Sequence, residues 1–211
     1  MGTNAGDNKL TATTGGAYWS VFSAAGPYLD AVVQGTWFEE TSRPIGLSQL
    51  TTSGPVAAAS LEAGIPFVVS HAWVIEPQIQ VAYQNVNLRD THDSAASIAF
   101  DDAQSLAGRI GVRIATTWKP SAVMGQGGPI SIWVRPNIWN EFLGDSLTSF
   151  SSATGPISFG SDLGGTRFDI DTGVTAQIND AMSLFASAAY QEGIGNENHA
   201  YDLKGGFRFV W

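Results

Sequence analysis

The chain of 211 residues contains no cysteine. This absence excludes disulfide bonds, cysteine-ligated zinc sites and thiol catalysis. Long apolar runs are also missing, and no segment approaches the ~18 to 20 uninterrupted apolar residues that a membrane helix needs. The mean hydropathy is close to zero, which would suit a soluble protein, but the alternating strands of a membrane barrel give the same average. The polar start MGTNAGDNKL has neither the basic region nor the apolar core of a secretory signal peptide.

Charge is scarce, and positive charge especially so. Only 14% of the residues are charged, well below the ~25% that is usual for a soluble domain. Ten Lys and Arg stand against 19 Asp and Glu, a net charge of −9, which excludes a basic nucleic-acid-binding surface. A chain with so little charge for its surface is expected to place an apolar face in lipid.

Helical periodicity is missing as well, whereas alternation of apolar and polar residues recurs along the chain. The 24 glycines are scattered through the apolar segments and further disfavour helices. The alternation predicts nine strands, at about residues 14–24, 27–39, 55–68, 73–86, 105–118, 129–142, 166–178, 182–191 and 200–211.

The connections between these predicted strands alternate in length. Short turns such as VSHA and NDA are followed by long segments rich in Ser, Gly and Asp, at residues 40–54, 87–104 and 143–165. In an up-and-down meander, alternate connections lie at the same end of the sheet. Short periplasmic turns and long extracellular loops are typical of outer-membrane barrels. The turn KPSAVMGQGG is longer than this pattern predicts. The sequence therefore predicts an all-β, antiparallel up-and-down transmembrane β-barrel.

Each predicted strand has one apolar and one polar face. In WVIEPQIQVAYQ (residues 73–84), Ile75, Ile79 and Val81 alternate with Glu76 and Gln80. We expect the apolar face to contact lipid and the polar face, with nearly balanced charge, to line a wet lumen. The predicted lumen-lining residues are Glu62, Glu76, Gln78, Gln80, Arg109, Arg113, Arg135, Asp169, Asp171, Lys204 and Arg208.

Aromatic residues gather near the ends of the predicted strands, where rings with a polar edge favour the membrane–water interface. In the first strand two pairs compete for the outer face, Trp19 with Val21 and Tyr18 with Phe22. The predicted interfacial residues are Trp37, Phe38, Phe67, Trp73, Tyr83, Trp118, Trp139, Phe142, Tyr190, Tyr201 and Trp211.

Sites for chemistry are weakly supported. His92, Asp93 and Ser94 are adjacent in a predicted loop, which does not provide the geometry of a catalytic triad. The acidic residues around them lack the ligand spacing of a calcium loop. The glycine runs match no phosphate-binding fingerprint. No catalytic residue, cofactor or metal site is therefore predicted, and we expect that the chain is not an enzyme.

Six stretches appear in the order and spacing of the C-terminal translocator domain of autotransporters, the type V secretion barrels. They are GPYLDAVVQGTWF, AASLEAGIPF, WVIEPQIQVAYQ, FDDAQSLAGRIGVRI, ISIWVRPNIWNEF and LKGGFRFVW. The chain closely resembles this family over about residues 15–211. The resemblance implies a twelve-stranded barrel in the bacterial outer membrane, an N-terminal passenger and a helix through the lumen. It also implies that Phe207, Phe209 and Trp211 form the terminal signal read by the outer-membrane assembly machinery.

The nine predicted strands align with the last nine of the family's twelve. We therefore expect a polar N-terminal segment at 1–13, followed by an incomplete translocator barrel at 14–211. On this interpretation the chain is a truncated fragment, because a nine-stranded sheet leaves two open edges that lipid does not satisfy. The alternatives are a small stand-alone porin or adhesin barrel and a soluble lipocalin-like carrier.

Overall fold

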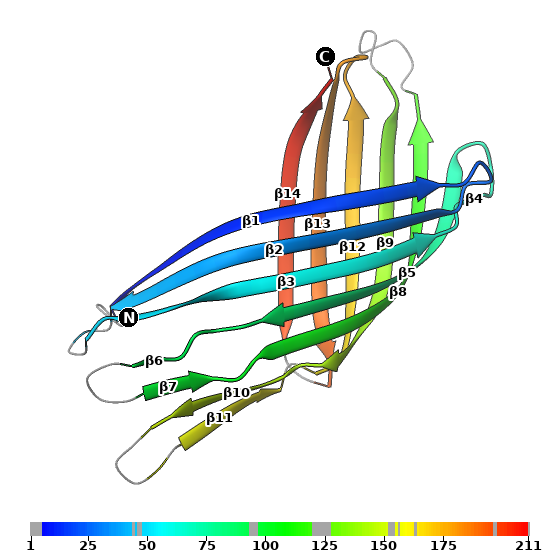
Figure 1. Ribbon diagram of the computed structural model, residues 1–211. Coiled ribbons are helices and arrows are strands. Elements are labelled where there is room, and N and C mark those ends of the chain that lie inside the picture. The colour runs from blue at the N-terminus through cyan, green and yellow to red at the C-terminus, as the bar shows by residue number, and fades with distance from the viewer. Residues whose placement is uncertain are drawn as a thin grey trace.

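The computed structural model describes residues 6–43, 45, 48–92, 97–119, 128–151, 155, 157–162, 164–195 and 198–210. Within these ranges the chain is all-β (Figure 1). None of these residues forms a helix that is long and apolar enough to cross a membrane. The long strands are β1 (Asp7–Phe22), β2 (Tyr28–Arg43), β3 (Leu50–Gly64), β5 (Trp73–Val86), β8 (Ala103–Trp118), β9 (Ile130–Leu143), β12 (Gly165–Gln177), β13 (Met182–Ile194) and β14 (His199–Phe209).

These nine strands form one antiparallel meander, in the order β1-β2-β3-β5-β8-β9-β12-β13-β14. The two-residue strand β4 (Phe67–Val68) adds to the edge of β5. The sheet curls strongly, so that β1, β2 and β3 pass in front of β12, β13 and β14 (Figure 1). Among the described residues, β1 pairs only with β2 and β14 only with β13. The fold is therefore a curled half-barrel.

All nine predicted strands are present, but several are longer than the alternation indicated. β1 begins at Asp7, so residues 7–13 of the expected polar segment belong to this strand and pair with the far end of β2. At the other end of the chain, β13 reaches Ile194 and β14 begins at His199, so His199 lies in a strand and not in a loop. The long turn predicted around residues 120–127 falls outside the described residues.

Two of the predicted long loops contain strands. Residues 87–104 include β6 (Thr91–His92) and β7 (Ser97–Phe100), and residues 143–165 include β10 (Asp145–Phe150) and β11 (Ile157–Asp162). They form a second sheet, here called the outer sheet, in the order β11-β10-β7-β6. Their Ser- and Gly-rich composition indicated loops, but pairing between the two segments supplies the hydrogen bonds that neither makes alone.

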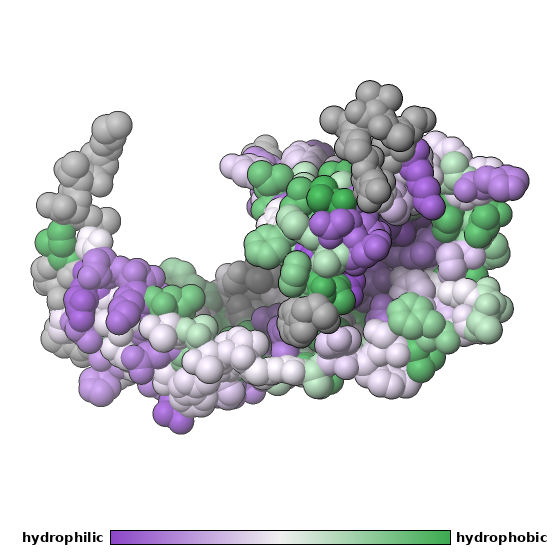
Figure 2. All heavy atoms as spheres, turned by 90° about the horizontal axis from the view of Figure 1, so that it is seen from above, coloured by the Kyte–Doolittle hydropathy of each residue, from purple (hydrophilic) through white to green (hydrophobic). Residues whose placement is uncertain are grey.

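The two faces of the curled sheet differ in exposure. On β5, Ile79 is 61% exposed, and its partner Ile110 on β8 is 70% exposed. On the opposite face of the same strands, Gln78 and Arg109 are buried. Curling crowds the side chains inside the bend and spreads those outside it, so the polar face is the concave one. Figure 2 shows polar residues in the hollow of the curled sheet.

Glycines let bulky rings lie flat on this concave face. Trp133 on β9 is the direct cross-strand partner of Gly173 on β12, and a Cβ at Gly173 would lie 2.6 Å from the indole ring. Tyr28 on β2 covers Gly64 on β3 in the same way. In both pairs the missing side chain is what permits the close approach.

Candidate functional site on the concave face

The guanidinium of Arg109 is the centre of a polar network on the concave face. Its side chain is 1% exposed, although β8 belongs to a single layer of sheet. Nη2 lies 2.6 Å from Glu62 Oε2, Nε donates to Gln80 Oε1 at 2.9 Å, and Nη1 donates to Asn137 Oδ1 at 2.7 Å and to Gln78 Oε1 at 3.2 Å. These partners come from β3, β5 and β9, so one side chain ties four strands together.

Tyr28 joins the network from β2. Its hydroxyl donates to Glu62 Oε1 at 2.7 Å and lies 3.3 Å from Glu76 Oε1. The amide of Gln78 donates to Tyr28 Oη at 2.9 Å and to Glu76 Oε1 at 2.6 Å. Both carboxylates therefore accept hydrogen bonds from neutral donors, and Glu62 also forms an ion pair with Arg109.

A second ion pair extends the network across β9 and β12. Arg135 Nε and Nη2 donate to Asp171 Oδ2 at 2.9 and 2.8 Å, while the amide of Asn137 donates to Asp169 and Asp171. Asp169 Oδ1 and Asp30 Oδ1 are buried without a hydrogen-bond partner among the described residues. Acidic groups on β2, β3, β5 and β12 thus share the concave face with basic groups on β8 and β9.

Two tryptophans of β9 stack with arginines on the same concave face. Trp133 lies 5.5 Å from the Arg113 guanidinium and 5.8 Å from that of Arg135. The ring of Trp139 lies 5.6 Å from Arg109 and 4.9 Å from Arg167. These separations are those of cation–π contacts.

The placement of Trp139 corrects the sequence interpretation, which put this ring at the lipid interface. Two-residue alternation places Trp139 on the face of Arg135 and Asn137, and position near a strand end was the wrong criterion. The same alternation puts Phe38 on the face of Asp30, and puts Tyr18 and Phe22 there too, since Ser20 pairs with Asp30. Trp211 lies outside the described residues.

Most of the predicted polar residues meet in this network, but three do not. Arg113 contacts Trp133 instead. Lys204 pairs with Asp202 of its own strand at 2.8 Å, with both side chains exposed, and Arg208 is also exposed. Sequence reasoning missed Tyr28 and Asn137, although both alternate correctly with charged residues of their own strands. The residues that do meet are Glu62, Glu76, Gln78, Gln80, Arg109, Arg135, Asp169 and Asp171.

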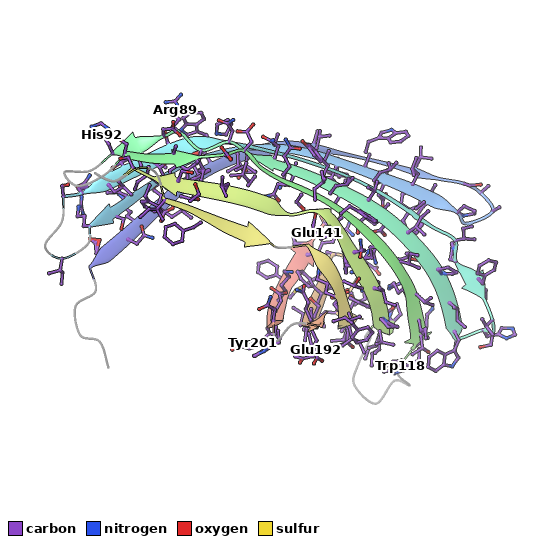
Figure 3. The ribbon with its side chains drawn as sticks, turned by 90° about the horizontal axis from the view of Figure 1, so that it is seen from below. Arg89, His92, Trp118, Glu141, Glu192 and Tyr201 are labelled. Atoms are coloured by element: carbon purple, nitrogen blue, oxygen red, sulfur yellow. The ribbon has the colours of Figure 1, made fainter. Side chains whose placement is uncertain are left out.

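Above the network the concave face opens into a cavity of about 330 Å³. Small side chains such as Ser60 and Ala82 line one side, and Trp139 and Arg167 line the other. Glu141 stands at its rim, on the inner side of the curve (Figure 3).

The carboxylate of Glu141 accepts hydrogen bonds from groups at a β-bulge. The register between β8 and β9 shifts at Leu106 and Ala107, which frees backbone N–H groups from the ladder. Glu141 Oε1 accepts from Leu106 N at 2.7 Å and from Leu143 N at 3.3 Å, and Oε2 accepts from Ser105 Oγ at 2.7 Å. Just beyond this bulge, β10 leaves the main sheet and pairs with β7.

In the acidic segment that follows β5, two carboxylates of the described residues accept hydrogen bonds that hold the local structure. Asp102 Oδ1 accepts from Asn87 Nδ2, and Asp90 Oδ1 accepts from Phe100 N, which secures the outer sheet. His92 lies in β6 and not in a loop, while Asp93 and Ser94 are outside the described residues. In the described part of the chain, no three His, Asp or Glu side chains gather as a metal site would require.

An antiparallel, curled sheet with an exposed apolar outer face and a polar concave face is the wall of a transmembrane β-barrel. The model of one family, the autotransporter beta-domain, matches residues 1–189. The chain therefore belongs to the autotransporter β-domain family. These domains are outer-membrane translocators and not an enzyme family, and this membership places the chain in the bacterial outer membrane.

Similar proteins agree with this assignment. The chain is 25% identical to the pertactin autotransporter of Bordetella bronchiseptica over 93% of its own length and 21% of the relative. It is 28% identical to the probable autotransporter YfaL of Escherichia coli over 80% of its length and 12% of that protein. The chain thus spans about a fifth or less of these relatives.

Solved structures show the same fold. The match to the beta domain of the Bordetella autotransporter BrkA covers all of this chain and 78% of the BrkA chain, with a TM-score of 0.65 and 21% identity. The match to the transport unit of the autotransporter AIDA-I from Escherichia coli covers 97% of this chain and 67% of the AIDA-I chain, with a TM-score of 0.61 and 18% identity.

Proposed function

We propose that the chain forms most of the wall of an export channel, through which an N-terminal passenger reaches the cell surface and by which it stays anchored. The observation that carries this proposal is the contrast between the faces, with the Arg109 guanidinium buried on the concave side and Ile79 and Ile110 exposed on the convex side. A carrier with an apolar cavity would need the opposite arrangement.

The mechanism is physical. A lumen that carries acidic groups on β2, β3, β5 and β12 and basic groups on β8, β9 and β12 holds water without a large net charge. A polypeptide of either sign therefore passes without a high electrostatic barrier. In this proposal the chain transports and anchors, and it catalyses no step. The lumen is lined by Glu62, Glu76, Gln78, Gln80, Arg109, Arg113, Arg135, Asp169, Asp171, Lys204 and Arg208.

The closed barrel needs partners for both edges of the sheet. A lipid-exposed edge would leave backbone N–H and C=O groups unsatisfied, at several kcal/mol each. We infer that further strands join β1 to β14, and that the predicted barrel region 14–211, extended by residues 7–13 of β1, is one part of that barrel. The passenger and a lumenal helix are its other partners.

Assembly of the barrel is proposed to start from the last strand. Phe207 and Phe209, two residues apart, both lie on the convex face of β14, and both are exposed. We infer that these rings, together with Trp211, are read by the outer-membrane assembly machinery before they contact lipid.

Water access tests the channel directly, because the chain has no native cysteine. Ser60→Cys places a thiol on the concave face and Leu61→Cys places one on the convex face of the same strand. In the full-length protein in outer membranes, we expect a membrane-impermeant maleimide to label position 60 and to spare position 61. Surface passenger, measured by protease release from intact cells, is the matched functional readout. Labelling of position 61 alone would refute the proposal.

A further inference from the structure

Three cations lie apart from the polar network, at the outer ends of the first strands. They are Lys9 on β1, Arg43 on β2 and Arg89 just beyond β5. Lys119 follows the other end of β8, where the short turns lie. Alternation along the strands puts the other six of the ten Lys and Arg residues on the concave face, namely Arg109, Arg113, Arg135, Arg167, Lys204 and Arg208. The three outer cations are at the end of the meander with long connections, which faces the cell exterior.

These three side chains lie on the convex face of the sheet. The register from Ile79 on β5 through β3 to β2 is regular, so alternate residues of β2, among them Trp37 and Arg43, share the convex face with Ile79. Lys9 pairs with a residue on that same face of β2. Arg89 lies on the outer side of the curve, away from the hollow (Figure 3).

The guanidinium of Arg89 covers a tryptophan ring. Its Cζ lies 5.0 Å from the centre of the Trp37 ring, which is a cation–π separation, and both side chains are exposed. The Arg89 backbone N–H donates to Ser53 O at 3.0 Å, which fixes its position beside β3. A stacked guanidinium keeps the N–H groups along its edge for an anion. In the part of the chain that the structure describes, Arg89 takes part in none of the ion pairs.

Arg43 is held at the surface by two neighbours. Its Nε donates to Gln49 Oε1 at 2.9 Å, and Nη1 lies 3.4 Å from Asp7 Oδ2. The side chains of this ion pair are 57% and 65% exposed, so the pair itself contributes little to stability. Lys9 is also exposed. Asp7 and Glu39 are the carboxylates that alternation places on this face of β1 and β2, so cations outnumber them. Lys9, Arg43 and Arg89 are here called the outer basic patch.

The outer basic patch lies where the apolar surface of the sheet ends. On the convex face of β2, apolar and small side chains run from Leu29 to Trp37, and only polar ones follow as far as Arg43. On β3 the same change falls at Pro55, the partner of Trp37. Tryptophan rings are enriched at the membrane–water interface. The cations just beyond Trp37 are therefore at the depth of the lipid headgroups.

We propose that the outer basic patch binds the phosphate groups of lipopolysaccharide, the phosphorylated glycolipid of the outer leaflet. Arginine forms bidentate hydrogen bonds with phosphate oxygens, and Lys and Arg beside an apolar membrane surface attract anionic headgroups. The Arg89 guanidinium, oriented by Trp37, contacts one phosphate, while Arg43 and Lys9 supply charge beside it. Glu39 opposes binding. The site requires only that the apolar face meets lipid, so it is independent of passenger export.

Lipid titration of the full-length protein, folded in neutral detergent micelles, tests the site. Native mass spectrometry counts the lipid bound at each concentration of diphosphorylated lipid A, dephosphorylated lipid A or phosphatidylglycerol. We expect the dissociation constant for diphosphorylated lipid A to be roughly tenfold lower than for the other two lipids. Equal binding of dephosphorylated lipid A would overturn the proposal, because acyl chains alone would then explain it. Equal binding of phosphatidylglycerol would overturn it as well, since any anionic lipid would then suffice.

Single substitutions locate the binding. Lys9→Gln and Arg89→Gln should each raise the dissociation constant roughly fivefold, the contribution of one cation at an anionic lipid surface. Lys119→Gln removes the same charge at the other end of the sheet and should leave the constant unchanged. Glu39→Gln should tighten binding, because it removes a repelling charge. Heat-modifiable migration verifies that each variant is folded. Equal constants for Arg89→Gln and Lys119→Gln, or weaker binding by Glu39→Gln, would overturn direct phosphate binding at the patch.

Discussion

Replacing Ile79 by Arg provides a direct test of which face meets lipid. Ile79 lies on the convex face of β5, between Trp73 and Tyr83, two rings that the sequence predicts at the membrane–water interface. At about 3.3 Å per residue and a tilt near 45°, it lies ~14 Å in depth from Trp73 and ~9 Å from Tyr83. The apolar band of such barrels is ~25 Å tall, so the side chain is within a few ångströms of the bilayer midplane.

The expected cost follows from that depth. An arginine at the midplane of a membrane barrel destabilises it by ~2–4 kcal/mol, and the cost falls to ~0–1 near the interfaces. The partner Ile110 is also exposed on the convex face, so no polar neighbour is available to the new charge. We therefore expect Ile79→Arg to lower the free energy of unfolding by ~3 kcal/mol.

The assay is denaturant unfolding of the full-length protein folded into lipid vesicles. The control should put the same charge on the concave face at a similar depth. Gln80 is unsuitable, because it accepts a hydrogen bond from Arg109 and a second cation there would be repelled. Ala82 lines the cavity of about 330 Å³, so Ala82→Arg should cost less than ~1 kcal/mol. Equal losses for the two variants, or a larger loss for Ala82→Arg, would refute the assigned orientation.

Two further outcomes are expected from the same unfolding assay, and a third from amide hydrogen exchange. Arg109→Ala leaves buried partners without their cation and should cost ~3–5 kcal/mol, and a loss below ~1 kcal/mol would show that the network is solvated. Gly173→Ala forces Trp133 off the strand and should cost ~1–3 kcal/mol, whereas Gly35→Ala meets no atom within 4 Å and should change stability little. Glu141→Ala removes the carboxylate that accepts hydrogen bonds at the bulge. If this lowers the local opening free energy by ~1.4 kcal/mol or more, amide hydrogen exchange there should accelerate more than tenfold. Unchanged exchange would show that the bulge is stable without Glu141.

Strand content and face could be predicted because alternation is local. The pattern of β5, with Ile79 and Val81 against Gln78 and Gln80, requires only that successive side chains point to opposite sides. The low charge then identified the apolar side as the one in lipid. Both features survive in the structure, and so does the order of the nine long strands.

The network around Arg109 was predicted only in part. Alternation gave its face, but which groups touch depends on the stagger between strands. Glu62 and Arg109 lie on β3 and β8, which are not neighbours, since β5 runs between them. They meet at 2.6 Å because the sheet curls. The error at Trp139 had a local cause. Its position near a strand end was given more weight than its alternation with Asn137, which places it on the concave face.

The outer sheet lay beyond sequence reasoning for a further reason. The segments Ser97–Phe100 and Ile157–Asp162 are short, and both pair with β10, which lies between them; Ser97–Phe100 pairs with β6 as well. Their strand character is a property of the assembled hairpins.

The amino-acid sequence by itself determined the period-two pattern, the lipid-facing side and the family of this protein, because each of these depends on residue type and spacing within one strand. The tertiary structure alone decided the Arg109 network, the bulge at Glu141 and the stacking of Arg89 on Trp37. These depend on register and curvature between strands, and such long-range pairings are set by the packing of the whole sheet.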